Sequence, residues 1–139
     1  MSSDMGNVSG TKQRPWRLKA SDDGSPYTAW RDPSSRPPAL VVRAGAAELR
    51  FHLRCLNDLH EMLKDRGDWM LLGTAGEREP AAEGTVEAWA RSPKNPVAGC
   101  YGLTAGQRGR FAAFIPPIME ALDLAEVEAA RRRLRIRAI

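Results

Sequence analysis

A stretch of strict alternation at residues 48–54 constrains the fold more than any other part of this sequence. Leu49, Phe51 and Leu53 alternate there with charged and polar residues. A period of two with this contrast predicts a strand that has one face in an apolar core and the other face in water. A β-rich run at residues 39–43 precedes it, separated by a turn that contains glycine. The two runs therefore predict an antiparallel hairpin.

Two further strands are predicted upstream, at residues 16–20 and 27–31, because a dense cluster of turn formers separates two β-rich runs. The proline-rich segment 32–38 is predicted to be a loop, since proline lacks a backbone donor. Residues 15–54 are therefore expected to form an antiparallel β-meander of up to four strands. Residues 1–14 are small and polar without periodicity, and we expect them to form a disordered tail.

The clearest helix is predicted at residues 57–66. Asn57 or Asp58 can cap its start, Glu61 follows Asp58 with the spacing of a capping box, and Gly67 is expected to end it. The helical wheel has two opposite stripes, formed by Leu56, Leu59 and Leu63 on one side and by Asp58, Glu61 and Asp65 on the other. The leucines are expected to face the core and the acids to face water.

Residues 55–139 contain the remaining predicted elements. In chain order they are the helix at 57–66, a short buried strand at 69–72, a short helix or strand at 85–92, a helix at 116–122, and two strands at 124–128 and 134–138 around an arginine-rich turn. Pro116 and Pro117 are expected to open the third helix, because proline fits the first turn of a helix and interrupts the chain before it. The fold class is therefore predicted to be α+β, with a single domain over residues 15–139.

This order of helices followed by a two-stranded ribbon resembles the winged-helix arrangement of many bacterial DNA-binding regulators. The stretch 122–128 and the run 131–137 look like the exit of a recognition helix and a wing. The resemblance implies a wing whose arginines contact phosphates, which gives affinity without reading sequence. The helix in the recognition position, residues 116–122, has no Arg, Asn or Gln to read base edges. Sequence-specific recognition is therefore not expected from it.

Positive charge is concentrated at the C-terminal end of this basic protein, which has a formal net charge of +4 and a pI of about 9.5. Residues 39–107 hold eight Lys/Arg and nine Asp/Glu, whereas residues 129–139 hold five arginines and no acid. Together with two arginines of the glycine-rich stretch 101–110, they form the predicted nucleic-acid-binding set: Arg108, Arg110, Arg131, Arg132, Arg133, Arg135 and Arg137. The predicted partner is duplex DNA. Two alternatives stay open, a solvated edge strand guarded by charge and a plain glycine-rich turn.

No catalytic residue, metal site or cofactor is predicted. Cys55, Cys100, His52 and His60 follow no metal-binding spacing, and both cysteines are expected to be buried, reduced thiols. No nucleophile-and-base signature is present. An enzyme or ligand-binding protein stays an alternative, which would need a pocket assembled from separated residues such as His60, Trp89, Tyr101, Arg108 and Arg110. Trp69, just after the helix stop, is predicted to lie in the core.

The sequence also bears on location and partners. No run approaches the roughly 18–20 apolar residues that cross a membrane, and the first residues lack the features of a signal peptide. We therefore expect a cytoplasmic protein without membrane partners. A protein-interaction or self-association module, such as a homodimer, is the second functional class. It is suggested by the apolar segment 111–119 and by a sheet with few guarded edges.

Seven short stretches within residues 16–139 carry a resemblance to a known family. They are residues 58–60, 67–70, 83–89, 95–97, 101–103, 108–111 and 116–117. On these stretches the chain resembles a family of small actinobacterial proteins of unknown function. The resemblance implies no activity. Because the arginine and alanine content also fits a high-GC genome, basic charge alone is weak evidence for a function.

Overall fold

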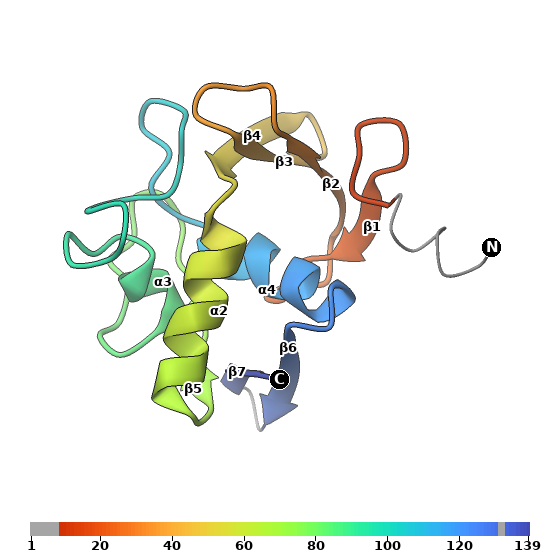
Figure 1. Ribbon diagram of the computed structural model, residues 1–139. Coiled ribbons are helices and arrows are strands. Elements are labelled where there is room, and N and C mark those ends of the chain that lie inside the picture. The colour runs from red at the N-terminus through yellow and green to blue at the C-terminus, as the bar shows by residue number, and fades with distance from the viewer. Residues whose placement is uncertain (1–8, 131–132) are drawn as a thin grey trace.

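The computed structural model describes residues 9–130 and 133–139. Two antiparallel sheets lie at opposite ends of the molecule, and two longer helices lie between them (Figure 1). The predicted mixture of helices and antiparallel strands is therefore confirmed. No helix among the described residues is long and apolar enough to span a lipid bilayer.

The first sheet is the predicted meander. Its strands are β1 (Trp16–Lys19), β2 (Pro26–Asp32), β3 (Ala39–Ala44) and β4 (Ala47–His52), and their spatial order follows the chain. The β3–β4 register pairs Leu40 with Phe51 and Val42 with Leu49. The predicted alternation is therefore correct, because it places these apolar side chains on one face of the hairpin, toward the core.

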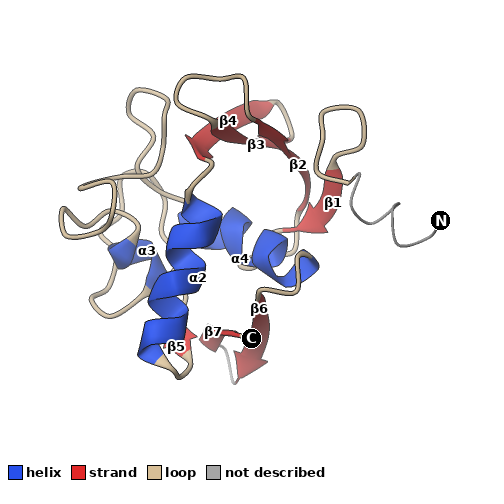
Figure 2. Ribbon diagram, viewed as in Figure 1, coloured by secondary structure: helices blue, strands red, loops and turns tan. Residues whose placement is uncertain are grey.

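The second half of the chain holds the helices and a small sheet (Figure 2). In chain order the elements are α2 (Cys55–Arg66), β5 (Met70–Leu71), α3 (Val86–Trp89), α4 (Phe111–Ala121), β6 (Ala125–Ala130) and β7 (Arg133–Ala138). The strands of the small sheet are ordered β5-β7-β6, all antiparallel. Of the two alternatives for residues 85–92, the structure has a short helix, whose start is capped by Thr85 accepting from the Ala88 amide at 3.2 Å.

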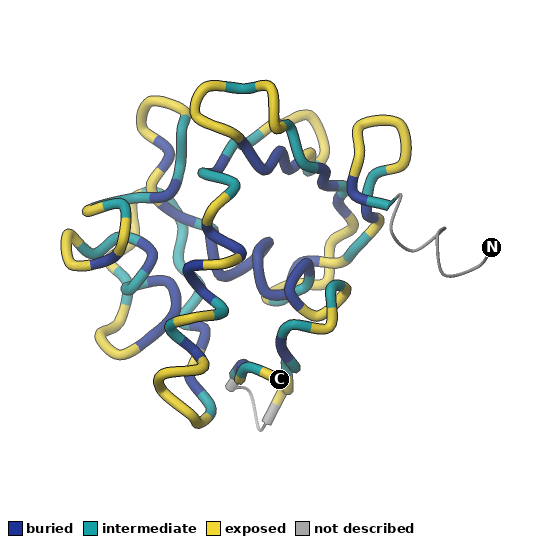
Figure 3. The backbone as a smooth tube through the Cα atoms, in the orientation of Figure 1, coloured by how far each residue is buried: buried dark blue, intermediate teal, exposed yellow. Residues whose placement is uncertain are grey.

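Helix α4 is the centre of the core. Eight of its residues are buried, and Figure 3 shows the helix almost entirely in the buried colour. Phe114 packs edge-on against Tyr27 of the first sheet, with ring centroids 4.9 Å apart, and Phe111 packs edge-on against Phe51 at 5.8 Å. The apolar segment 111–119 is therefore buried inside a single chain.

The prediction that this helix opens at Pro116 is wrong. The helix begins at Phe111 and carries Pro116 and Pro117 in its interior. A proline inside a helix removes the bond to the carbonyl four residues earlier, which here leaves the carbonyls of Ala112 and Ala113 without a donor. Ser21 supplies both bonds, because its hydroxyl donates to Ala112 O at 2.5 Å and its amide donates to Ala113 O at 2.9 Å.

The start and the polar stripe of α2 also differ from the prediction. The helix begins at Cys55. Arg54 takes the N-cap position in place of Asn57 or Asp58, and its side chain makes no capping hydrogen bond. Asp58 is buried rather than facing water, because its carboxylate accepts from the Tyr101 hydroxyl at 2.9 Å and from Arg54 Nε at 2.8 Å. The predicted end is confirmed, since Gly67 closes the helix in the left-handed conformation with φ of 70°.

Part of the predicted tail is described by the structure. Residues 9–14 form a turn, in which the Gly10 amide donates to Arg14 O at 2.8 Å. The same segment is attached to the first sheet, because the Arg31 amide donates to Gly10 O at 2.9 Å. Residues 1–8, the rest of the predicted tail, lie outside the described residues.

The role of Ser21 can be tested by a double-mutant cycle. We expect Ser21→Ala to lower the free energy of unfolding by about 1–3 kcal/mol, because it leaves the buried Ala112 carbonyl without a donor. In a Pro116→Ala background the new amide at position 116 can donate to the same carbonyl, so the loss should be smaller. Urea unfolding measures both, with Ser25→Ala, an exposed serine, as control. Equal losses in the two backgrounds would contradict this account.

Candidate nucleic-acid interface

The predicted basic ribbon is formed by β6 and β7. Ile136 is buried in the core, whereas Arg135 and Arg137 point to the other side of the strand. This part of β7 therefore has a basic face backed by an apolar one. The register pairs Glu128 with Arg135 and Glu126 with Arg137.

The arginines at the base of the ribbon are neutralised by their neighbours. Arg135 forms an ion pair with Glu128 at 2.5 Å, and Arg137 forms one with Glu126. Both guanidinium groups also lie over the ring of Trp69, at 4.3 and 4.6 Å from its centroid. Trp69 is therefore half-buried beneath arginines, and its predicted place in the core is wrong.

The residues between Ala130 and Leu134, called the tip of the ribbon below, have a different charge pattern in the sequence. Arg133 is opposite Ala130 in the register, so no acid faces it directly on the neighbouring strand. Its side chain, and the whole of Arg131 and Arg132, lie outside the described residues. The acidic partners thus end at Glu128, and the three arginines of the tip follow beyond them in the sequence.

The other two predicted arginines lie at the opposite end of α4. Arg110 is the residue before its first turn, its amide donates to Ala75 O at 2.9 Å, and its guanidinium lies 4.8 Å from the centroid of the Phe114 ring. Arg108 is exposed on the preceding turn. The ribbon follows the other end of this helix, which is about 16 Å long at 1.5 Å per residue. The length of α4 therefore separates Arg108 and Arg110 from the start of the ribbon.

The aromatic residues of the proposed ligand pocket are packed together instead. The rings of Trp89 and Tyr101 are stacked with centroids 5.3 Å apart, and Phe111 lies 5.4 Å from Tyr101. Burial raises the pKa of the Tyr101 hydroxyl, as does its bond to Asp58. His60 is half-buried, and its Nε2 has no hydrogen-bond partner among the described residues. The rings of Trp89, Tyr101 and Phe111 therefore fill the space between these three residues.

A buried ion pair that sequence reasoning missed organises the start of α4. Glu87 is fully buried and accepts from the Ala112 amide at 2.9 Å and from Arg91 Nε at 3.2 Å. Arg91 also donates to the carbonyls of Glu79, Ala75 and Gly76. Burial raises the pKa of the Glu87 carboxyl, whereas the Ala112 amide and Arg91 act to lower it. The only sequence signal was the spacing of Glu87 and Arg91, four residues apart on a short helix.

The remaining candidate ligands do not come together. Both cysteines are free thiols. The predicted burial is confirmed for Cys55, where it raises the pKa of the thiol, and is wrong for Cys100, which is half-buried. Within residues 9–130 and 133–139, no three His, Cys, Asp or Glu side chains are placed to hold a metal ion.

Comparison with known proteins places the chain in a family. A family model described as "Family of unknown function (DUF6855)" matches residues 8–139. The chain belongs to this family. The resemblance to a family of unknown function is therefore confirmed, and membership of DUF6855 covers all the elements described above. No curated protein and no solved structure matches the chain.

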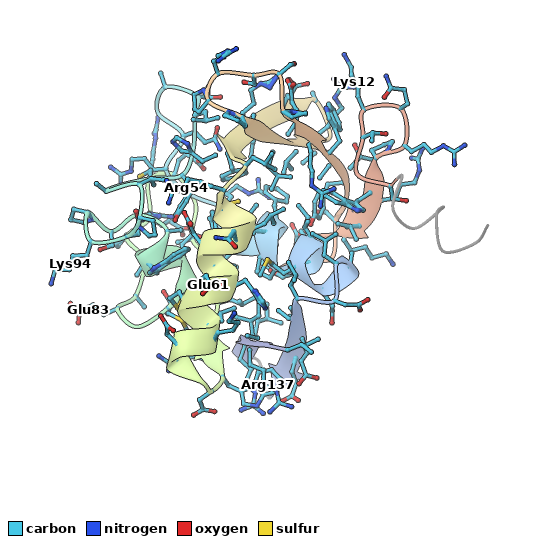
Figure 4. All side chains as sticks on the ribbon, viewed as in Figure 1. Lys12, Arg54, Glu61, Glu83, Lys94 and Arg137 are labelled. Carbon is cyan, nitrogen blue, oxygen red and sulfur yellow. The ribbon has the colours of Figure 1, made fainter. Side chains whose placement is uncertain are left out.

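Loss of the Glu87 carboxylate should be strongly destabilising. We expect Glu87→Ala to lower the free energy of unfolding by about 3–5 kcal/mol, because it leaves the nearly buried Arg91 without its partner. Glu87→Gln should cost less, since an amide oxygen can still accept from Ala112. Glu83→Ala is the control, because Glu83 is exposed and points away from the molecule (Figure 4). Chemical unfolding that gives Glu87→Ala and Glu83→Ala the same stability would refute the role.

Proposed function

We propose that this protein binds nucleic acid without catalysing a reaction, with duplex DNA as the partner and phosphate contacts from the tip of the β6–β7 ribbon. The observation that carries the proposal is the charge gradient along the ribbon. Its base is neutralised by Glu126 and Glu128, whereas the tip carries Arg131, Arg132 and Arg133 after two alanines. Three successive arginines that follow two alanines in the sequence suit contact with a phosphate backbone.

The order of elements supports this reading. The succession α2, β5, α3, α4, β6, β7 and the sheet order β5-β7-β6 are similar to those of a winged helix, with the ribbon as its wing. The helix in the recognition position is α4, and its buried side chains cannot enter a groove. The proposed binding is therefore insensitive to DNA sequence, because phosphate contacts carry no sequence information.

Arg108 and Arg110 are proposed as additional contacts with a separate group of phosphates. They lie at the other end of α4 from the ribbon, so they do not extend the same contact surface. The self-association alternative loses one of its two supports, since the apolar segment 111–119 is used inside the chain.

Binding should depend on salt in proportion to the phosphates that the ribbon engages. For a duplex of about 20 bp, we expect log K to fall linearly with log salt, with a slope of about −0.9 per phosphate contact. Replacing Arg131, Arg132 and Arg133 by alanine should weaken binding equally on unrelated sequences and flatten the slope. Fluorescence anisotropy measures both, with the exposed Arg78→Ala as control. Absence of binding by the unmodified protein at about 50 mM salt would end the proposal.

Removal of the acidic partners should have the opposite effect. Glu126→Gln with Glu128→Gln keeps the size of both side chains but removes the charges that neutralise Arg137 and Arg135. We expect tighter binding and a steeper salt dependence, because two more arginines become available to phosphates. Anisotropy titrations on the same duplex test this, and Glu61→Gln with Glu83→Gln is a control of equal charge. Unchanged affinity in the Glu126→Gln, Glu128→Gln variant would contradict a contact made by the ribbon.

A further inference from the structure

The first sheet has an outer face that no described helix covers. Helices lie on the inner side of this curved sheet (Figure 2), where Tyr27, Leu40 and Phe51 face the core. The strand register places Arg17, Thr28 and Arg43 in one row across three strands, and alternation turns their side chains to the outer face. Lys19 follows Arg17 by two residues and lies on the same face.

This outer face carries an excess of positive charge. The cations that line its hollows are Lys12, Arg17, Lys19, Arg31, Arg43 and Arg50, and the acids are Asp32 and Glu48. Arg43 pairs with Glu48 at 2.8 Å and Arg50 pairs with Asp32 at 3.1 Å. Both acids are thus already engaged. Lys12, Arg17 and Lys19 are exposed and form no ion pair within the described residues.

Two adjoining hollows shape the face. A groove of about 670 Å³ is bordered by Arg17, Lys19 and Arg43, with Thr28 and Pro26 also lining it. A second hollow of about 290 Å³ is lined by cations and acids that include Lys12 and Arg50. Arg43 lines both, so the two hollows follow one another across the strands.

The aromatic residue of this face is not available to stack on bases. Trp30 is only 7% exposed, and the Arg43 guanidinium lies 5.4 Å from the centroid of its ring. Val41, its neighbour in the register, is also buried, and neither residue belongs to the main core. Any polyanion bound here would therefore be held through its charges, without the base stacking that single-strand binders use.

We propose that the outer face of the first sheet is a second surface for the phosphate backbone of nucleic acid, so that one molecule can hold two duplex segments. Arg17 and Arg43 are two strand spacings apart, about 10 Å, which suits a row of phosphates better than one phosphate group. The large apolar side chains exposed in the described residues, Leu71 and Ile139, lie elsewhere, so the face lacks the apolar anchors of a membrane-binding surface.

The two surfaces lie too far apart to act as one. Helix α2 runs from the first sheet toward the small sheet and is about 18 Å long. In Figure 4 the labels of Lys12 and Arg137 stand at opposite ends of the molecule. The choice of nucleic acid as ligand rests on the proposed function, but the charge of the sheet face is independent of the ribbon.

Charge reversal on the sheet tests the second surface. The test uses the background in which Arg131, Arg132 and Arg133 are alanine, because the sheet is then the remaining proposed surface. In that background we expect Arg17→Glu with Lys19→Glu to weaken binding to a duplex of about 20 bp by about tenfold or more at low salt. The matched control in the same background is Arg78→Glu with Lys94→Glu, two exposed cations outside both surfaces, which should cost no more than about threefold. If the sheet variant binds like this control, the second surface is refuted, whatever the ribbon variant of Arg131, Arg132 and Arg133 shows. Circular dichroism and thermal unfolding check that all variants fold.

A bridging assay tests whether both surfaces act in one molecule. With one duplex on beads and a second, fluorescent duplex in solution, the unmodified protein should capture the second duplex. The variant with alanine at Arg131, Arg132 and Arg133 and the sheet variant, Arg17→Glu with Lys19→Glu, should each still bind the beads. Neither should capture a second duplex. A protein that binds the beads and captures nothing refutes bridging while leaving the proposed function intact. The proposal would also be overturned if the protein bound phosphatidylserine vesicles instead of DNA and the sheet variant lost that binding.

Discussion

The fold depends on how the backbone of α4 is satisfied, because this helix is buried and carries two prolines in its interior. A buried carbonyl without a donor is costly, so the groups that Pro116 and Pro117 leave free must find partners elsewhere. Ser21, in the turn between β1 and β2, donates to both Ala112 O and Ala113 O. The Tyr27 hydroxyl donates to Phe114 O at 2.6 Å. These bonds attach the first sheet to the central helix in one register.

The same requirement explains the buried charges. The first turn of α4 needs acceptors for its amides, and Glu87 provides one from the short helix α3. Arg91 balances that carboxylate and holds the carbonyls of the preceding loop. Asp58 is used in a similar way, between Arg54 and the Tyr101 hydroxyl. The buried acids therefore serve the architecture, and each has its charge or hydrogen-bonding capacity met by a named partner.

The net charge of a surface depends on the neighbouring strand, because acidic side chains on that strand can neutralise a cluster of arginines. The arginines of β7 are dense in the sequence, yet two of them are balanced by glutamates of β6. The cations of the first sheet are dispersed over residues 12–50 and form no cluster in the sequence. They gather on one face because antiparallel pairing sets Arg17 and Arg43 in the same row. Net charge along the chain is thus a poor guide to net charge on a surface.

The sequence by itself determined the strands of the meander, the apolar face of the 48–54 run, the end of α2 at Gly67 and the two strands of the ribbon. Each of these follows from local periodicity or turn chemistry, which act over a few residues. Only the tertiary structure decided that α4 starts before its prolines and that Asp58 is buried. The donors that make both possible, Ser21 and Tyr101, are separated from their acceptors by 91 and 43 residues. A local sequence pattern cannot reveal a hydrogen-bond partner that comes close only when the chain has folded.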